Sequence, residues 1–149
     1  AKRNNAVAST DVKSFEHLVC TEQLSRRLGF KVGEELIRVV RVRSLNGSAR
    51  QVDHGYFLES IAKGLTPEIA ARSIYDYLEH KRGVKVMASR RTVSVELAND
   101  EDCSYLDLGK YNCVAVMESQ SYTSDGILFE VTHARTHPEI FHYRVNSKR

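Results

Sequence analysis

Two arginines in an apolar stretch of the sequence are spaced for binding an anion. Arg41 and Arg43 are two residues apart, so in a strand their side chains point to the same side of the sheet. Paired guanidinium groups on one sheet face can hold a phosphate or a carboxylate with bidentate hydrogen bonds. A solvated strand face, or ion pairs to Asp53 and Glu130, would explain the spacing equally well. Arg38 falls on the opposite face, where we expect it at the surface.

Three more side chains could take part in the same chemistry. Ser73 precedes a predicted helix and is most simply its N-cap, although a helix N-terminus with a hydroxyl group also attracts anions. Tyr75 fits the core and the wall of a pocket equally well. Glu130 lies in the apolar run ILFEV, so we expect a salt bridge to an arginine across the sheet, or a ligand hydroxyl, to satisfy its charge.

The sequence offers little support for a metal centre or for nucleophilic catalysis. His133, His137 and His142 lie close together, and in a strand His133 and His137 share a face. They would be too far apart along that strand for an easy chelate, and no carboxylate at a matched spacing supports them. No nucleophile elbow of the G-x-S-x-G type occurs. We therefore expect no metal and no cofactor.

The composition is that of one ordinary globular domain. The chain has 149 residues, of which 42% are hydrophobic and 28% charged. Its net charge of +3 is too small for a dedicated nucleic-acid-binding domain. Three widely spaced cysteines without a CxxC pair disfavour a disulfide framework or a zinc site and favour a reducing cytoplasm. No apolar run is long enough to span a bilayer, so we expect no membrane contact.

A mostly antiparallel sheet must position these side chains, because Asn46-Gly47 and Asp125-Gly126 are preferred hairpin turns. Capping residues and glycine stops predict short helices over 21–29, 73–83 and 99–109, and a helical stretch opened by Pro67. The alternating segments predict strands over 12–20, 35–44, 49–58, 84–97, 111–123, 127–137 and 141–145.

One pattern occurs twice along the chain. RRLGFKVGEELIRVVRVRSLNG and YLDLGKYNCVAVMESQSYTSDG each run from a helix through a Leu-Gly stop to a strand, a hairpin turn and a second strand. This internal pseudo-repeat predicts an α+β domain with a mostly antiparallel sheet and flanking short helices. We place the domain at residues 12–149 and interpret residues 1–11 as a ragged linker or terminus.

The stretches VVRVRSLNGSARQVDHGYFLESIAKGL, ARSIYDYLEHKRGVKV and LDLGKYNCVAVMESQSYTSDGILFEVTHARTHPEIFHY resemble the effector-binding domain, called UTRA, of HutC-type GntR-family transcriptional regulators. The resemblance covers nearly the whole chain and implies a chorismate-lyase-like fold. It also implies a homodimer that binds a small anionic metabolite. Operator DNA would be bound by an N-terminal winged helix–turn–helix that is absent from this chain.

The resemblance also implies which residues of this chain bind the effector. It matches the family's arginine-x-arginine to Arg41 and Arg43, which in members that sense sugar phosphates face the effector. The acidic position on the next strand is usually Glu and is Asp53 here, which shortens its reach. The remaining family positions correspond to Ser73 and Tyr75, to Glu130, and to Thr136 in place of a frequent tyrosine.

Three functions follow as hypotheses. The first is the sensory half of a cytoplasmic transcriptional repressor, which is not an enzyme. The second is a chorismate-lyase-like enzyme that acts on a small anionic substrate, since that enzyme shares the fold. The third, a domain that itself binds nucleic acid, is disfavoured by the mixed charge. The sequence does not identify the effector, and sugar phosphates, urocanate and phosphonates all remain open.

Overall fold

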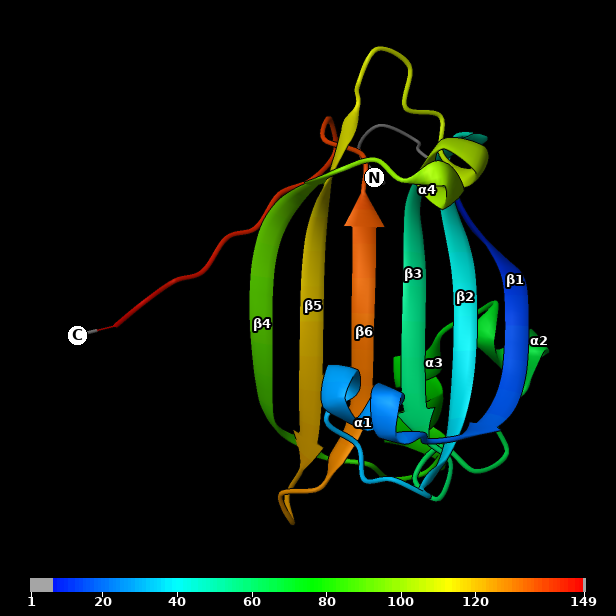
Figure 1. Cartoon of the computed structure of the whole chain (residues 1–149), viewed down its shortest axis with the longest axis vertical. Helices are drawn as coiled ribbons and strands as arrows, with labels where there is room; N and C mark the ends of the chain where they lie inside the picture. Colours follow the sequence, from blue (N-terminus) through cyan, green and yellow to red (C-terminus); the bar gives the residue numbers. More distant parts are fainter. Residues whose placement is uncertain (1–6, 149) are drawn as a thin grey trace.

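The computed structural model describes residues 7–148, which form one six-stranded antiparallel sheet (Figure 1). The strands lie side by side in the order β1-β2-β3-β6-β5-β4. Their bounds are β1 (Ala8–Val19), β2 (Glu35–Leu45), β3 (Ser48–Leu58), β4 (Val86–Leu97), β5 (Cys113–Thr123) and β6 (Leu128–Thr136).

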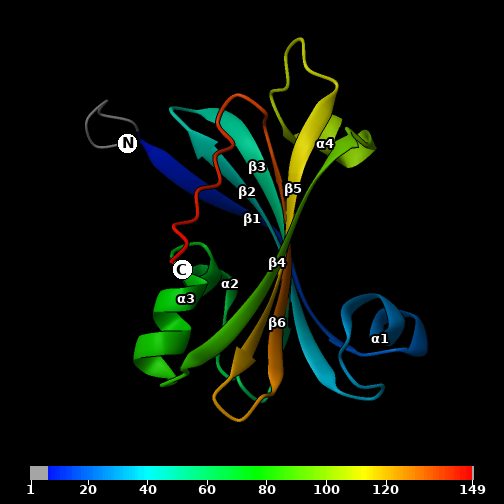
Figure 2. The same ribbon diagram turned by 90° about the vertical axis from the view of Figure 1, so that its left-hand side faces the viewer.

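Short helices cover both faces of the sheet, as the edge-on view in Figure 2 shows. One face carries α2 and α3 and is called the α2/α3 face here; the opposite face, with α1 and α4, is the α1/α4 face. None of the helices within residues 7–148 is long and apolar enough to cross a membrane. The helical segments are α1 (Glu22–Leu28), α2 (Pro67–Ala70), α3 (Ile74–Asp76), η2 (Tyr77–Lys81) and α4 (Asp100–Tyr105).

The predicted pseudo-repeat is confirmed by the topology. The first half runs β1-α1-β2-β3 and the second half β4-α4-β5-β6, and the two halves meet where β3 pairs with β6. The helices α1 and α4 occupy equivalent places on the same face (Figure 2). The α+β class with a mostly antiparallel sheet is therefore confirmed as well.

Local signals placed most of these elements correctly. Asn46 and Gly47 both have positive φ, 52° and 79°, as a two-residue hairpin turn between β2 and β3 requires. The Thr21 side chain accepts a hydrogen bond from the backbone of Leu24 at the start of α1, and Gly29 ends that helix in the left-handed region.

Two predicted strands differ from the structure. The first begins at Ala8, inside the predicted linker, because residues 8–11 pair with β2 through backbone hydrogen bonds that need no apolar pattern. The predicted last strand, 141–145, is not a strand. After Pro138 the chain leaves the sheet, and β6 already has β3 and β5 on its two sides, so no free edge is available next to it.

The predicted helix 73–83 is divided in two. A single turn, α3, is followed by the π-helical segment η2, in which Arg82 donates its backbone N–H to the Tyr77 carbonyl at 3.1 Å. Both Ile74 and Leu78 are buried against the sheet, so the apolar pattern that predicted the helix identifies its buried face correctly.

The core consists of two apolar clusters. The larger one joins the sheet to α1 and to the α2–η2 segment through Leu28, Phe57, Ile74, Leu78 and Phe129. The smaller one places Val42, Val52 and Val116 under Leu106 and Leu108, which follow α4. The larger cluster fixes the helices that border the cavities described below.

A buried ion pair fixes α4 to the sheet. Asp102 is 0% exposed and closes the capping box of α4 with Asn99. Its two carboxylate oxygens accept hydrogen bonds from Arg135 on β6, from Nε at 2.9 Å and from Nη2 at 2.9 Å. These bonds raise the pKa of Arg135 above its ordinary value. Arg135 also pairs with Glu96 at 2.8 Å, but that carboxylate is half exposed.

We expect Asp102→Asn to lower the free energy of unfolding by about 3–5 kcal/mol, because it leaves most of a buried arginine charge without its partner. The control is Glu96→Gln, which removes the exposed partner of the same arginine and should cost less than about 1 kcal/mol. Urea unfolding of both variants measures the difference. Equal losses would show that the buried pair does not hold α4.

Candidate functional site

A cavity of about 210 Å³ lies on the α2/α3 face, between the centre of the sheet and α3. Its floor is formed by side chains of β2, β3 and β6, and Ile74 and Tyr75 from α3 close it. It is lined by Val39, Arg41, Arg43, Gln51, Asp53, Gly55, Phe57, Ile74, Tyr75, Glu130, Thr132 and Ala134.

Arg41 and Arg43 point to the same side of β2 and share one carboxylate. The Asp53 Oδ2 atom lies 3.4 Å from Arg41 Nη2 and 3.2 Å from Arg43 Nε. The register explains the contact, because Asp53 is directly opposite Arg41 on β3. The other carboxylate oxygen accepts a hydrogen bond from Gln51 Nε2 at 2.5 Å. Asp53 therefore reaches both arginines despite being one methylene shorter than the family's usual glutamate.

The two arginines differ in burial. Arg41 is 9% exposed and donates a second hydrogen bond to the Ala70 carbonyl at the end of α2, whereas the Arg43 side chain is 45% exposed. Burial, and then the neighbouring positive charge of Arg43, lower the pKa of Arg41 below its ordinary value. The charges of Asp53 and Glu130 oppose this lowering, and a bound anion would act in the same direction.

Glu130 is the second acid of the cavity. It is 3% exposed, and the Tyr75 hydroxyl donates a hydrogen bond to it from α3. Burial, reinforced by Glu130, raises the pKa of Tyr75 to about 12, so the phenol keeps its proton at neutral pH. Burial also raises the pKa of Glu130, against the opposing effects of Tyr75, Ser121, Arg41 and Arg91. The sequence left open a salt bridge between Glu130 and an arginine across the sheet. Among residues 7–148, Arg41 bonds to Asp53 and Ala70 and makes no direct hydrogen bond to Glu130.

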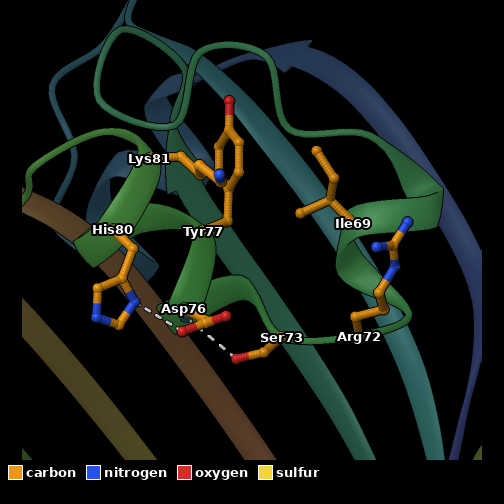
Figure 3. A pocket seen from close by; sticks show the side chains of 7 residues that line it. All are labelled: Ile69, Arg72, Ser73, Asp76, Tyr77, His80 and Lys81. Carbon is orange, nitrogen blue, oxygen red and sulfur yellow. Dashed lines mark hydrogen bonds and ion pairs between the residues drawn. The ribbon is translucent and has the colours of Figure 1, made fainter.

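Ser73 lies in a different cavity, on the outer side of the helical layer. Figure 3 shows its side chain beside Asp76, whose backbone N–H donates to Ser73 Oγ at 3.1 Å. The hydroxyl therefore caps α3, the simpler of its two predicted roles. This outer cavity of about 320 Å³ is lined by Ile69, Arg72, Ser73, Asp76, Tyr77, His80 and Lys81.

Thr136 is on the predicted sheet face but does not line the arginine cavity. It lies in a neighbouring cavity of about 250 Å³, whose other wall is the segment after β6. The sequence did not indicate how that segment folds back over the sheet. This second cavity is lined by Gln51, Met117, Ala134, Thr136, Ile140, Phe141 and His142.

Several residues that line the arginine cavity were not predicted from the sequence, although a simple signal could have identified them. Gln51 and Gly55 are two positions on either side of Asp53, and Thr132 and Ala134 follow Glu130 at the same interval. Strand alternation therefore places all of them on the α2/α3 face. Gly55 has a specific role, because a Cβ atom there would lie 2.8 Å from the Phe57 ring.

The three histidines that are close together in the sequence do not meet at one site. His133 lies on the α1/α4 face, where Nε2 is 3.0 Å from Glu118, and burial lowers its pKa. His142 lines the second cavity on the other face. His137 follows the end of β6, so it lies outside the strand in which it was predicted, and it packs edge-on against Tyr111.

The family is shown by comparison with known proteins. The model of the UTRA domain family matches residues 3–142, and the chain belongs to this family. It is an effector-binding domain of the kind found in GntR-family transcriptional regulators, as the resemblance predicted.

Relatives and solved structures agree on this class. The HTH-type transcriptional regulator TreR of Bacillus subtilis is 28% identical over 134 residues, which are 90% of this chain and 56% of that protein. The structure of the B. subtilis trehalose repressor (TreR) effector-binding domain matches with a TM-score of 0.87 and 27% identity, covering 95% of this chain and 98% of that one. A GntR-family regulator from Bacillus cereus shares the fold, with a TM-score of 0.81, 23% identity, and 95% and 99% coverage.

The chain spans about half the length of the curated relatives it matches. Those relatives are described as transcriptional regulators, which favours the sensory domain of a regulator over the chorismate-lyase-like enzyme.

The raised pKa of Glu130 predicts a pH-dependent stability. Above about pH 4.5, its ordinary pKa, the unfolded chain releases this proton while the folded chain retains it, so stability is lost as the pH rises towards the folded pKa. Glu130→Gln removes this loss. We therefore expect the variant to gain stability relative to the wild type above pH 4.5, by at most about 1.4 kcal/mol per pH unit.

Thermal unfolding between pH 4 and 8 (roughly the range where a raised carboxyl titrates) measures this difference. The control is Glu79→Gln, the same change at an exposed position in η2, which accounts for the effect of net charge. A constant difference between Glu130→Gln and the wild type would refute the raised pKa.

Proposed function

We propose that this domain senses a small anionic metabolite whose charged group binds between Arg41 and Arg43. The observation that carries the proposal is the charge arrangement of the cavity, in which two arginines share the single carboxylate of Asp53. Keeping a guanidinium buried is costly unless it is compensated, and Arg41 is nearly inaccessible to water. Arg43 is exposed enough to meet a ligand that enters from solvent.

The other end of the cavity suits hydroxyl groups. Glu130 accepts a hydrogen bond from Tyr75, and Gln51 and Thr132 add polar groups along the floor. A ligand that carries an anionic group and several hydroxyls would satisfy both ends, and a sugar phosphate has this chemistry. The relative TreR is described as a trehalose repressor, which supports a carbohydrate-like effector here. In this proposal Ser73 caps α3 and does not contact the anionic group. Thr136 belongs to the neighbouring cavity.

We further propose that the whole regulator is a cytoplasmic homodimer that binds operator DNA through a separate N-terminal domain. The matched segments cover only 56% and 49% of two relatives that are HTH-type regulators, which supports the second domain. Tyr75 and Ile74 come from the same short helix, so a ligand that contacts them would shift α3 relative to the sheet. This movement is the proposed signal to the DNA-binding half.

The edge strand β4 is the proposed dimer contact. It pairs with β5 on one side only, and all twelve of its residues are exposed. Val93, Val95 and Leu97 lie on the α2/α3 face and are 42%, 72% and 74% exposed. An apolar, unpaired edge of this length is usually covered in the native assembly, and a second copy of the chain can cover it by symmetry.

We expect both arginines to be required for binding the anion. Arg43→Ala should weaken the effector by roughly tenfold to a hundredfold, whereas Arg43→Lys retains weaker binding because it keeps the charge but not the planar fork. The control is Arg38→Ala, since Arg38 lies on the same strand but on the opposite face, paired with Glu16. A thermal-shift screen of anionic metabolites identifies the effector, and calorimetry then compares the variants. Unchanged affinity in Arg43→Ala and Arg41→Ala would place the site elsewhere.

We expect Val95→Glu to dissociate the dimer, because it places a charge in the middle of the proposed apolar contact. The dissociation constant should rise by about a hundredfold. Ser94→Glu is the matched control, since the same residue is introduced one position away on the opposite face of β4. Analytical ultracentrifugation measures both variants. A monomeric wild type at high concentration, or two dimeric variants, would contradict the proposal.

A further inference from the structure

We propose that the effector extends from the arginine pair into the second cavity on the α2/α3 face, and that the extending part is a ring with an apolar face. This inference rests on the proposed function, because it takes the anionic group to lie on Arg41 and Arg43. The second cavity adds about 250 Å³ to the 210 Å³ of the first.

The two cavities are neighbours on the same sheet face. Both are lined by Gln51 of β3 and Ala134 of β6. In the register, Gln51 is opposite Thr136 and Ala134 is opposite Met117, so the second cavity lies over the strands next to the first one. Ala134 has only a methyl group, which keeps the floor low where the cavities meet. From Asp53 on β3 to Met117 on β5 there are two strand spacings, or roughly 10 Å.

The outer wall of the second cavity is held in place by specific contacts. Ile140 and Phe141 belong to the segment after β6, which Figure 2 shows passing over the α2/α3 face. The buried His137 donates its backbone N–H to the Arg50 carbonyl at 2.8 Å and accepts one from Ile140 at 3.2 Å. An ion pair between Arg50 and Glu139, at 3.6 Å, adds to this attachment. The wall is therefore tied to β3, one of the strands that carry the arginine cavity.

The side chains of this cavity select the chemistry of the occupant. Met117 and Phe141 face it from the floor and the wall, and a thioether with an aromatic ring favours contact with another ring. The polar groups of Gln51 and Thr136 lie along the floor, where they can meet the polar edge of such a ring. We find no basic side chain other than His142 among the lining residues, so a second anionic group would not be favoured there.

A series of phosphate esters tests the extension. The 149-residue chain is titrated by calorimetry with inorganic phosphate, phenyl phosphate, phenylethyl phosphate and phenylbutyl phosphate. We expect affinity to rise along the series as the ring reaches the second cavity, and the best ester to bind roughly tenfold tighter than inorganic phosphate.

Two variants locate the ring. Ala134→Leu fills the place where the cavities meet and Phe141→Ala removes the outer wall, and each should abolish the gain of the esters. Because Phe141 does not line the arginine cavity, Phe141→Ala should also leave the affinity for inorganic phosphate unchanged. Ala88→Leu, the same enlargement at an exposed position on β4, is the control and should bind every ester like the wild type. Thermal unfolding shows whether each variant is folded, and Phe141→Ala decides the question if Ala134→Leu is not.

The outcomes separate this inference from the proposed function. If inorganic phosphate binds and depends on Arg43, but the esters bind no more tightly, the extension is wrong and the anion site stands. A gain that persists in both Ala134→Leu and Phe141→Ala also overturns the extension. If neither phosphate nor any ester binds, the proposed function itself fails.

Discussion

The burial of Arg41 in the middle of one sheet face is the constraint on which the rest of the site depends. A guanidinium group in that position needs acceptors, and the structure supplies the Asp53 carboxylate from β3 and the Ala70 carbonyl from α2. The first contact ties the β2–β3 register to the site, and the second ties the helical layer to it. Because Arg43 shares the same carboxylate, the pair retains an excess of positive charge that a ligand can neutralise.

Charged side chains are paired differently on the two faces of the sheet. On the α1/α4 face, Arg135 is held by Asp102 and Glu96, His54 by Glu101, and His133 by Glu118. These pairs lock α4 and the strands together and explain why polar side chains occur in the interior of β6. On the α2/α3 face, two arginines share one acid, and Glu130 is bonded to a tyrosine. The ion pairs of the α1/α4 face thus join each of these bases to an acid, whereas the two arginines of the α2/α3 face depend on one shared acid.

Much of the fold was predictable because its signals are local. Turn pairs such as Asn46-Gly47, caps such as Thr21 and glycine stops such as Gly29 act within a few residues, and strand alternation placed Arg41 and Arg43 on one face. The pairing of β3 with β6 depends on contacts between distant segments, as does the contact between Tyr75 and Glu130. Such contacts depend on how strands and helices that are distant in the sequence come together, which local patterns do not encode.

The same limit explains why Ser73 and Thr136 lie outside the arginine cavity. Ser73 was correctly predicted as a cap, but its placement on the outer side of α3 depends on the direction in which the helix docks. The position of Thr136 relative to the cavities depends on the path of residues 137–142, where an apolar segment was predicted as a strand. After the last strand, Ile140 and Phe141 are partly buried over the sheet face, whereas Tyr143 and Val145 are exposed.

The most direct test of the central claim is to locate an anion in a crystal of the domain. Crystals soaked in tungstate, an oxyanion that scatters anomalously, would show where the protein holds a doubly charged tetrahedral group. We expect an anomalous peak within hydrogen-bonding distance of the guanidinium groups of both Arg41 and Arg43. A peak at Arg72 and Lys81 in the outer cavity, with none at the arginine pair, would contradict it.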